Sequence, residues 1–296
     1  MKISDFKKLN LILGWLCFLI AFIVYFFTSE PTVSFWDTGE YITTSSKLQV
    51  GHPPGAPLYQ MLGAFFSIFA FGKENIGFVM NLMSGFASAL TIAFMYWSII
   101  LILLKIVKTK KEFELKKNFA ISGAALVGCL SFTFTDSFWF NAVEAEVYAM
   151  ATLIMAVLFY LGLRWESDMH KPRGDKWLLL ISFVIGLSFG VHFMGLLTIP
   201  AIFLIYYFKN SKEINAKYGL SLKSGFVIAN IIGLVILMGV FKLILPNTLK
   251  FFSVIELLFV NNFGLPFNSG TLAAFVILGF TFYYLIDFTI KKINHC

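Results

Sequence analysis

Long apolar runs without charge dominate this chain and constrain what it can fold into. Residues 9–27 and 76–104 are two such runs, and each is long enough, as a helix, to cross the roughly 30 Å hydrocarbon core of a bilayer. Of the 296 residues, 58% are hydrophobic and only 13% are charged, against about 25% charged in ordinary soluble domains. So little charge cannot cover a water-facing surface. The sequence therefore predicts an all-α integral membrane protein.

Basic residues between the apolar runs indicate the topology. Lysine and arginine number 23, and they gather in short loops, such as residues 105–117, rather than on one surface. This pattern is the positive-inside signal of cytoplasmic loops, and it argues against a nucleic-acid partner. It predicts eight spans with both termini in the cytoplasm. These are 9–27, 76–104, 119–135, 144–163, two short spans within 177–208 that separate near His192 and Gly195, 226–245 and 271–290.

The first outer loop, residues 28–75, is the largest predicted segment outside the membrane. Within it, residues 56–71 are apolar but too short to cross, so we expect a helix that lies in the outer interface. Residues 136–143 are expected to form an outer turn, and residues 246–270 an outer loop. The chain is thus predicted to be a single transmembrane domain over residues 1–296, with a core over about 9–208.

Two carboxylates, Asp37 and Glu40, follow an aromatic pair in the first outer loop. On a helix, their spacing would place both on one face. Carboxylates at a membrane surface can act as a general base on a hydroxyl, or hold a divalent cation against a phosphate. A solvated loop with one helix-capping aspartate accounts for the same residues, and the spacing does not separate these alternatives.

A stiff segment with two cations comes next in the same loop. Three prolines and two glycines fall within residues 51–57, and such a turn would hold Lys47 and His52 near the outer headgroups. Cations in that position can bind a lipid phosphate. A purely structural turn before an interfacial helix explains the prolines equally well.

Further polar residues lie beside apolar runs. Glu144 suits the first turn of a helix, where the helix dipole favours a carboxylate. Glu146 lies deeper, next to Tyr148, where an acid is costly unless it is paired. His192 falls at the turn of the predicted hairpin, and a structural role explains it as well as a ligand role does. The centres of the predicted spans hold no lysine, arginine, aspartate or glutamate, which argues against ion-coupled transport and favours chemistry at the outer face.

Three segments together resemble a known family. They are FWDTGEYITTSSKLQVGHPPGAPLY, AVEAEVYAM and GLSFGVHFMGLLTIPA, and the resemblance covers about residues 33–201. The family is a bacterial domain-of-unknown-function family of multi-spanning proteins, related to a vertebrate protein O-mannosyltransferase and similar to the GT-C superfamily of membrane glycosyltransferases. The resemblance implies a GT-C-like bundle in the bacterial inner membrane, with interfacial helices and an acidic residue or pair in the first outer loop.

The resemblance also implies an activity. GT-C enzymes transfer a sugar from a polyprenyl phosphate donor on the extracytoplasmic side of the membrane. Here the sugar is expected to be mannose or another hexose, and the acceptor a hydroxyl of an exported protein or a glycan. Asp37 would be the catalytic base, with Glu40 as its partner or as an acceptor-positioning group. The same two carboxylates fit a divalent-cation site and a metal-free base equally well, so the loop suggests a divalent cation as a cofactor without requiring one.

The remaining roles follow the same scheme. The donor phosphate is expected to contact Lys47, His52 and His192. Residues expected to orient the sugar or the acceptor are Trp36, Tyr41, Glu146 and Tyr148. Two alternatives stay open. One is a non-enzymatic transporter or flippase of a lipid-linked sugar, and the other is an inactive truncated member, because longer members of the family carry further spans and a large carboxy-terminal region.

Overall fold

The computed structural model describes residues 3–107 and 115–294, and within these ranges all regular structure is helical. The chain divides into two compact units, Met1–Gly233 and Leu234–Cys296. Several helices are long and apolar enough to cross a bilayer. The predicted class, an all-α membrane protein, is confirmed.

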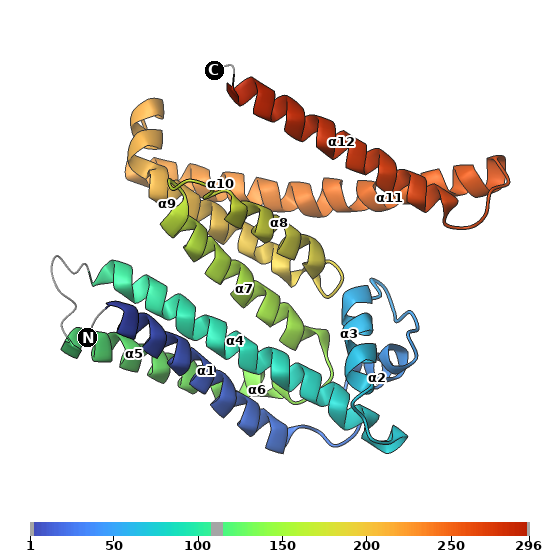
Figure 1. Cartoon of the computed structure of the whole chain (residues 1–296), viewed down its shortest axis with the longest axis horizontal. Helices are drawn as coiled ribbons and strands as arrows, with labels where there is room; N and C mark the ends of the chain where they lie inside the picture. Colours follow the sequence, from blue (N-terminus) through green and yellow to red (C-terminus); the bar gives the residue numbers. More distant parts are fainter. Residues whose placement is uncertain (1–2, 108–114, 295–296) are drawn as a thin grey trace. The chain divides into compact units, whose positions relative to one another are not determined.

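Helix α4 (Ile76–Ile106) is the centre of the first unit. It packs against α1 (Ile3–Thr28), α5 (Leu115–Thr133) and α7 (Val147–Asp168), as Figure 1 shows. The helices α1, α4 and α5 enclose an apolar core whose side chains are almost fully buried. Close packing of buried side chains, through many small dispersion contacts, is the main interaction that holds such helices together. This core holds α1 against α4. The first loop connects the carboxy-terminal end of α1 to the amino-terminal end of α4.

The prediction of an outer turn over residues 136–143 is wrong, because a short helix α6 (Asp136–Ala142) occupies it. The axis of α6 is bent by 68° from that of α5. Asp136 lies in the first turn of α6, where the helix dipole favours an acid. Phe138 packs into the core between α1, α4 and α5. This tertiary anchor holds the helix in place, and the local sequence did not reveal it.

The predicted break near His192 and Gly195 is confirmed. Helix α8 (Lys176–Ser188) ends before it, and a 3₁₀ helix, η2 (Phe193–Leu197), leads into α9 (Thr198–Tyr218). A Cβ atom on Gly195 would lie 2.5 Å from the Cβ atom of Ser188, so the close return of the chain requires glycine at this position. Helix α8 has 13 residues, about 20 Å of helix, which is short for a bilayer.

The prediction of an outer loop over residues 246–270 is wrong for most of its length. Helix α10 (Leu222–Gly239) is followed by a π-helical segment Val240–Ile244, then α11 (Leu245–Leu257), and a second π-helical segment Leu258–Asn262. Pro246 is the second residue of α11, which directly follows a π-helical segment, so the helical run from Leu222 to Asn262 continues through it. The loop is restricted to residues 263–268, before α12 (Ser269–Asn294).

The predicted count of eight spans is not confirmed. Among the described residues, five helical segments are long and apolar enough to cross a membrane, or six if the bent pair α5 and α6 forms one span. Helix α8 and the apolar part of α12, Ser269–Leu285, are shorter. Part of the basic cluster over residues 105–117, residues 108–114, lies outside the described residues. Which ends face the cytoplasm stays a prediction.

One carboxylate joins three helices of the first unit. Glu166 on α7 accepts hydrogen bonds from Lys105 Nζ on α4 and, at 3.2 Å, from Lys209 Nζ on α9. The side chain of Glu166 is only 18% exposed. Its charge is therefore partly shielded from water, and its loss would leave two ammonium groups uncompensated.

We expect Glu166→Ala to lower the free energy of unfolding by about 1–3 kcal/mol, because two charged donors lose their acceptor. Thermal unfolding of the purified chain in detergent micelles measures this change. Glu213→Ala is the control, since Glu213 is an exposed acid of α9 that makes no ion pair with the described part of the chain. Equal destabilisation in both variants would contradict the proposed role.

Candidate active site

The first loop folds against the ends of α4 and α7. It contains α2 (Thr38–Ser46) and α3 (Pro57–Ser67). Helix α3 confirms the helix expected within residues 56–71, and its place in the membrane interface stays a prediction. A shared core includes Tyr41, Tyr59 and Val191. The carbonyl oxygen of Gly190 accepts hydrogen bonds from the backbone N–H groups of Leu58 at 2.7 Å and Tyr59 at 3.1 Å. The three segments that carry the family resemblance therefore meet at one place.

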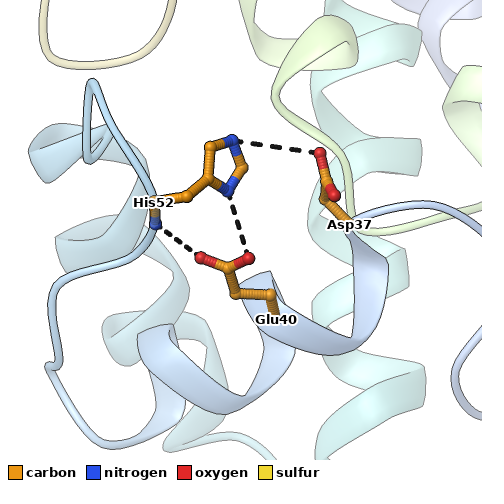
Figure 2. Close-up of side chains that lie close together, drawn as sticks. All are labelled: Asp37, Glu40 and His52. Carbon is orange, nitrogen blue, oxygen red and sulfur yellow. Dashed lines mark hydrogen bonds and ion pairs between the residues drawn. The ribbon is translucent and has the colours of Figure 1, made fainter.

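Asp37, Glu40 and His52 form a cluster in this loop (Figure 2). Glu40 Oε1 accepts the backbone N–H of His52 at 2.6 Å, and Glu40 Oε2 lies 3.1 Å from Nδ1 of the ring. The other ring nitrogen, Nε2, lies 3.9 Å from Asp37 Oδ2. The imidazole thus lies between two carboxylates. The side chains of Asp37 and His52 are 57% and 43% exposed, so a substrate can reach them.

Glu40 and His52 each stabilise the charged form of the other. The backbone N–H and the ring of His52 hold the pKa of Glu40 below its usual range. In return, the hydrogen bond with Glu40 raises the pKa of His52. Both shifts favour a carboxylate paired with an imidazolium. A protonated His52 can donate from Nε2 to an anion bound next to Asp37.

The Asp37 carboxylate does not cap α2, although Asp37 occupies the residue before the helix. The alternative of a helix-capping aspartate needs its oxygens on the first N–H groups of the helix, and no such bond is present. The preceding residue, Trp36, has a left-handed φ of 57°, which a bulky side chain rarely adopts. Backbone strain of this kind concentrates at functional sites.

Two buried carboxylates lie behind the cluster. Glu144 and Glu146 are 2% and 4% exposed. Glu144 Oε2 accepts a hydrogen bond from Ser34 Oγ at 2.6 Å, and Glu146 Oε1 accepts one from the backbone N–H of Asp37 at 3.1 Å. Helix α7 begins at Val147, so the expectation that Glu144 lies in a first helical turn is wrong. Both acids instead support the turn that carries Asp37.

Burial changes the protonation of these acids. It raises the pKa of Glu144, and it raises the pKa of Glu146 to about 7, with the charges of Asp37 and Glu144 adding to the effect. Glu146 therefore titrates near neutral pH. Perturbed carboxylates in a cleft are a common property of functional sites, although buried structural pairs show them too.

Sequence reasoning missed two amides that hold the site together. Asn81 on α4 donates from Nδ2 to the carbonyl oxygens of Glu30 at 2.7 Å and Thr32 at 2.8 Å, and its Oδ1 accepts the N–H of Ala145 at 2.8 Å. Gln60 Oε1 accepts from two hydroxyls of α2, Thr44 Oγ1 and Ser45 Oγ. A buried amide next to an apolar run was the available signal, because it needs partners from elsewhere.

The other predicted site residues lie around the cluster. The ring of Tyr41 lies 5.9 Å from that of His52, between centroids. The ring of His192 lies 5.3 Å from that of Tyr148, between centroids, at an angle of 56°. Its Nδ1 accepts the N–H of Met194, and burial lowers the pKa of His192. Lys47 is exposed at the far end of α2 and makes no ion pair within the described residues. The structure therefore does not bring His192 or Lys47 into contact with Asp37.

The cluster offers donors for a metal ion. One ligand atom each of Asp37, Glu40 and His52 lies within 4.8 Å of the others. Sequence reasoning named only the two carboxylates, and the structure adds an imidazole. Oxygen donors suit Mg²⁺, Ca²⁺ or Mn²⁺, and a nitrogen donor extends the range to Zn²⁺. The same atoms also form a self-sufficient set of ion pairs without a metal.

The part of the chain that carries the candidate active site is similar to known proteins. Residues 37–215, more than half of the chain, match the protein O-mannosyl-transferase TMEM260 N-terminal domain. The chain belongs to this family. The match begins at Asp37 and includes the whole cluster, the buried acids and His192. The predicted relation to a vertebrate protein O-mannosyltransferase is thereby confirmed, whereas the bacterial inner membrane stays a prediction.

Two relatives carry the family name. Protein O-mannosyl-transferase tmem260 of Dictyostelium discoideum is 25% identical over 240 residues, which cover 77% of this chain and 27% of that protein. Protein O-mannosyl-transferase TMEM260 of Mus musculus is 27% identical over 156 residues, which cover 51% of this chain and 19% of that protein. The chain thus spans about a quarter or less of these relatives. No solved structure matches it.

Proposed function

We propose that the chain is a membrane glycosyltransferase that moves a hexose, mannose in the first instance, from a polyprenyl phosphate to a hydroxyl of an exported protein. The observation that carries this proposal is the cluster itself, in which an exposed and uncapped Asp37 carboxylate lies 3.9 Å from a histidine. The family match begins at this residue, and both relatives are named as protein O-mannosyl-transferases.

In the proposed reaction Asp37 is the general base. Its carboxylate removes the proton from the acceptor hydroxyl as the oxygen attacks the anomeric carbon of the sugar. The bond from that carbon to the phosphate oxygen breaks, and the phosphate leaves with the electron pair, so the anomeric configuration inverts. His52, oriented by Glu40, donates toward the developing phosphate charge. Glu40 is then a positioning residue for His52 rather than a second base.

Reconstitution of the chain in vesicles tests the proposal. The donor is polyprenyl-phosphate-linked mannose, the acceptor is a peptide with serine and threonine, and mass spectrometry detects a peptide heavier by one hexose. We expect a product with the lipid-linked donor and none with a nucleotide-activated mannose. Absence of product with the lipid-linked donor would overturn the proposal.

A flippase would behave differently in the same vesicles. Lipid-linked mannose would move between the leaflets, as measured by its accessibility to an impermeable reagent, and the peptide mass would stay unchanged. The carboxylates at one helix end, and not at the centre of a span, favour the transferase over this alternative.

A pH prediction follows from the Glu40–His52 contact. Because Glu40 raises the pKa of His52, the imidazolium persists to higher pH than a free histidine would, and transfer should fall only above that pKa. Glu40→Gln removes the supporting charge, so the alkaline limb of the pH–rate profile should move to lower pH. Initial rates of transfer between about pH 5.5 and pH 9 check this, with Glu74→Gln as an exposed control. If the alkaline limb of Glu40→Gln coincides with that of the original chain, Glu40 does not set the protonation of His52 during transfer.

A further inference from the structure

A groove lies in the first unit, away from the candidate active site. It encloses about 500 Å³ between the amino-terminal end of α1 and the carboxy-terminal ends of α4 and α7. Along α4 it runs from Phe94 to Leu104, about 15 Å of helix, whereas Asn81 supports the active-site loop at the opposite end. Helix α4 lies between α1 and α7 and packs against both (Figure 1), and its residues line the groove together with residues of those two helices.

The wall of the groove is apolar and aromatic. The ring of Trp97 lies 5.3 Å from that of Phe94 and 6.3 Å from that of Tyr160, between centroids. The indole N–H of Trp97 donates to the carbonyl oxygen of Asn10 at 3.2 Å. Because its polar atom is satisfied within the protein, the indole presents an apolar surface to the groove. Leu11, Ile100 and Leu101 extend that surface.

Two cations line the same groove. Lys7 and Arg164 make no ion pair with the described part of the chain. The guanidinium carbon of Arg164 lies 5.3 Å from the centre of the Trp177 ring. The nearby acid, Asp168, is already bonded to Lys171 Nζ at 2.8 Å and to Trp177 Nε1 at 3.0 Å. The groove therefore has two cations at helix ends that form no close ion pair with the described residues, and an apolar wall beside them.

We propose that this groove binds one anionic phospholipid from the leaflet at that end of the helices. The phosphate lies between Lys7 and Arg164, and an acyl chain lies along Phe94, Trp97 and Ile100. Charge complementarity identifies the ligand, because a zwitterionic headgroup would bring its own cation toward two others. The volume is within the range of ordinary ligand sites, about 300–1,000 Å³. This site is independent of the proposed transfer reaction.

Native mass spectrometry of the full chain in detergent tests the proposal. The chain is mixed with palmitoyl-oleoyl phosphatidylglycerol or with the phosphatidylcholine of the same acyl chains. We expect one molecule of the anionic lipid to be retained about tenfold more strongly than the zwitterionic lipid. The double variant Lys7→Gln/Arg164→Gln should lose this preference and keep the weak binding of phosphatidylcholine.

Two further variants make the result specific. Lys7→Arg/Arg164→Lys keeps both charges and should retain the preference, which shows that charge determines it. Retained binding of phosphatidylcholine by the glutamine variant shows that this variant is folded. Lys212→Gln/Lys223→Gln removes the same charge from exposed positions on α9 and α10 and should behave as the original chain. Equal retention of both lipids, equal loss in this control, or displacement of the lipid by inorganic phosphate would overturn the proposal.

Discussion

Replacing Asp37 with asparagine is expected to lower sugar transfer about a hundredfold or more while the fold stays intact. An amide cannot accept the proton that the proposed mechanism removes from the acceptor, and general-base catalysis contributes roughly 10²–10⁴-fold. The fold should survive because the Asp37 side chain is 57% exposed, and its ion pair with His52 spans 3.9 Å. The substitution also keeps the backbone N–H that Glu146 accepts.

The measurement is mass spectrometry of exported glycoproteins and lipid-linked sugars in host cells that carry either chain. The asparagine variant should lose a protein-attached hexose and accumulate the lipid-linked donor. Asp136→Asn, an exposed acid on α6, is the matched control and should leave both profiles unchanged. Identical profiles for the original chain and Asp37→Asn would remove Asp37 from the mechanism.

The second large effect concerns Glu146 and the stability of the chain as a function of pH. Burial raises the pKa of Glu146 from 4.5 to about 7, so between these values the folded chain binds a proton that the unfolded chain has lost. The free energy of unfolding must then fall as the pH rises through this window. By about pH 8, the raised pKa of Glu146 should have lowered the free energy of unfolding by on the order of 3 kcal/mol, relative to its value at low pH.

We expect Glu146→Gln to remove most of this fall, because glutamine does not titrate and its amide oxygen can still accept the N–H of Asp37. Unfolding of both chains in detergent, from about pH 4.5 to pH 8, measures the difference. His52 has a raised pKa and changes stability in the same direction at higher pH, so part of the dependence should remain in the variant. Glu74→Gln should follow the original chain. Parallel curves for Glu146→Gln and the original chain would show that Glu146 is ionised throughout.

Sequence patterns predicted the parts of this molecule that depend on local length and polarity. Apolar runs predicted α1, α4 and α7, since a bilayer demands a minimum length of uncharged helix. They failed after residue 245, where a loop was expected and the helical run from Leu222 to Asn262 instead continues through Pro246. The break between α8 and α9 was predictable for two reasons. The basic residues that follow residue 208 are placed in the cytoplasm only if the chain turns back, and Gly195 marks where it can turn.

The residues of the site were largely predictable, including the buried Glu146, but the contacts that join its buried and exposed parts were not. Asp37, Glu40 and His52 were found because polar residues gathered in one loop. The contacts from Ser34 to Glu144 and from Asp37 to Glu146 join residues about 110 positions apart. No local pattern encodes such a pairing, so the sequence predicts a first helical turn for Glu144 and no role for Ser34. Only the packed structure shows which acids face water and which face the protein.

The three hydrogen bonds of Asn81 have a consequence for substrate entry. They tie residues 30–32 and residue 145 to the same helix, so the chain on the Asp37 side of the site forms a fixed wall. The facing segment, residues 48–55, is largely exposed and touches Glu40 through His52. Any movement of this segment would carry His52 with it, so the proposed contact of His52 with a donor phosphate depends on where residues 48–55 lie relative to the fixed wall.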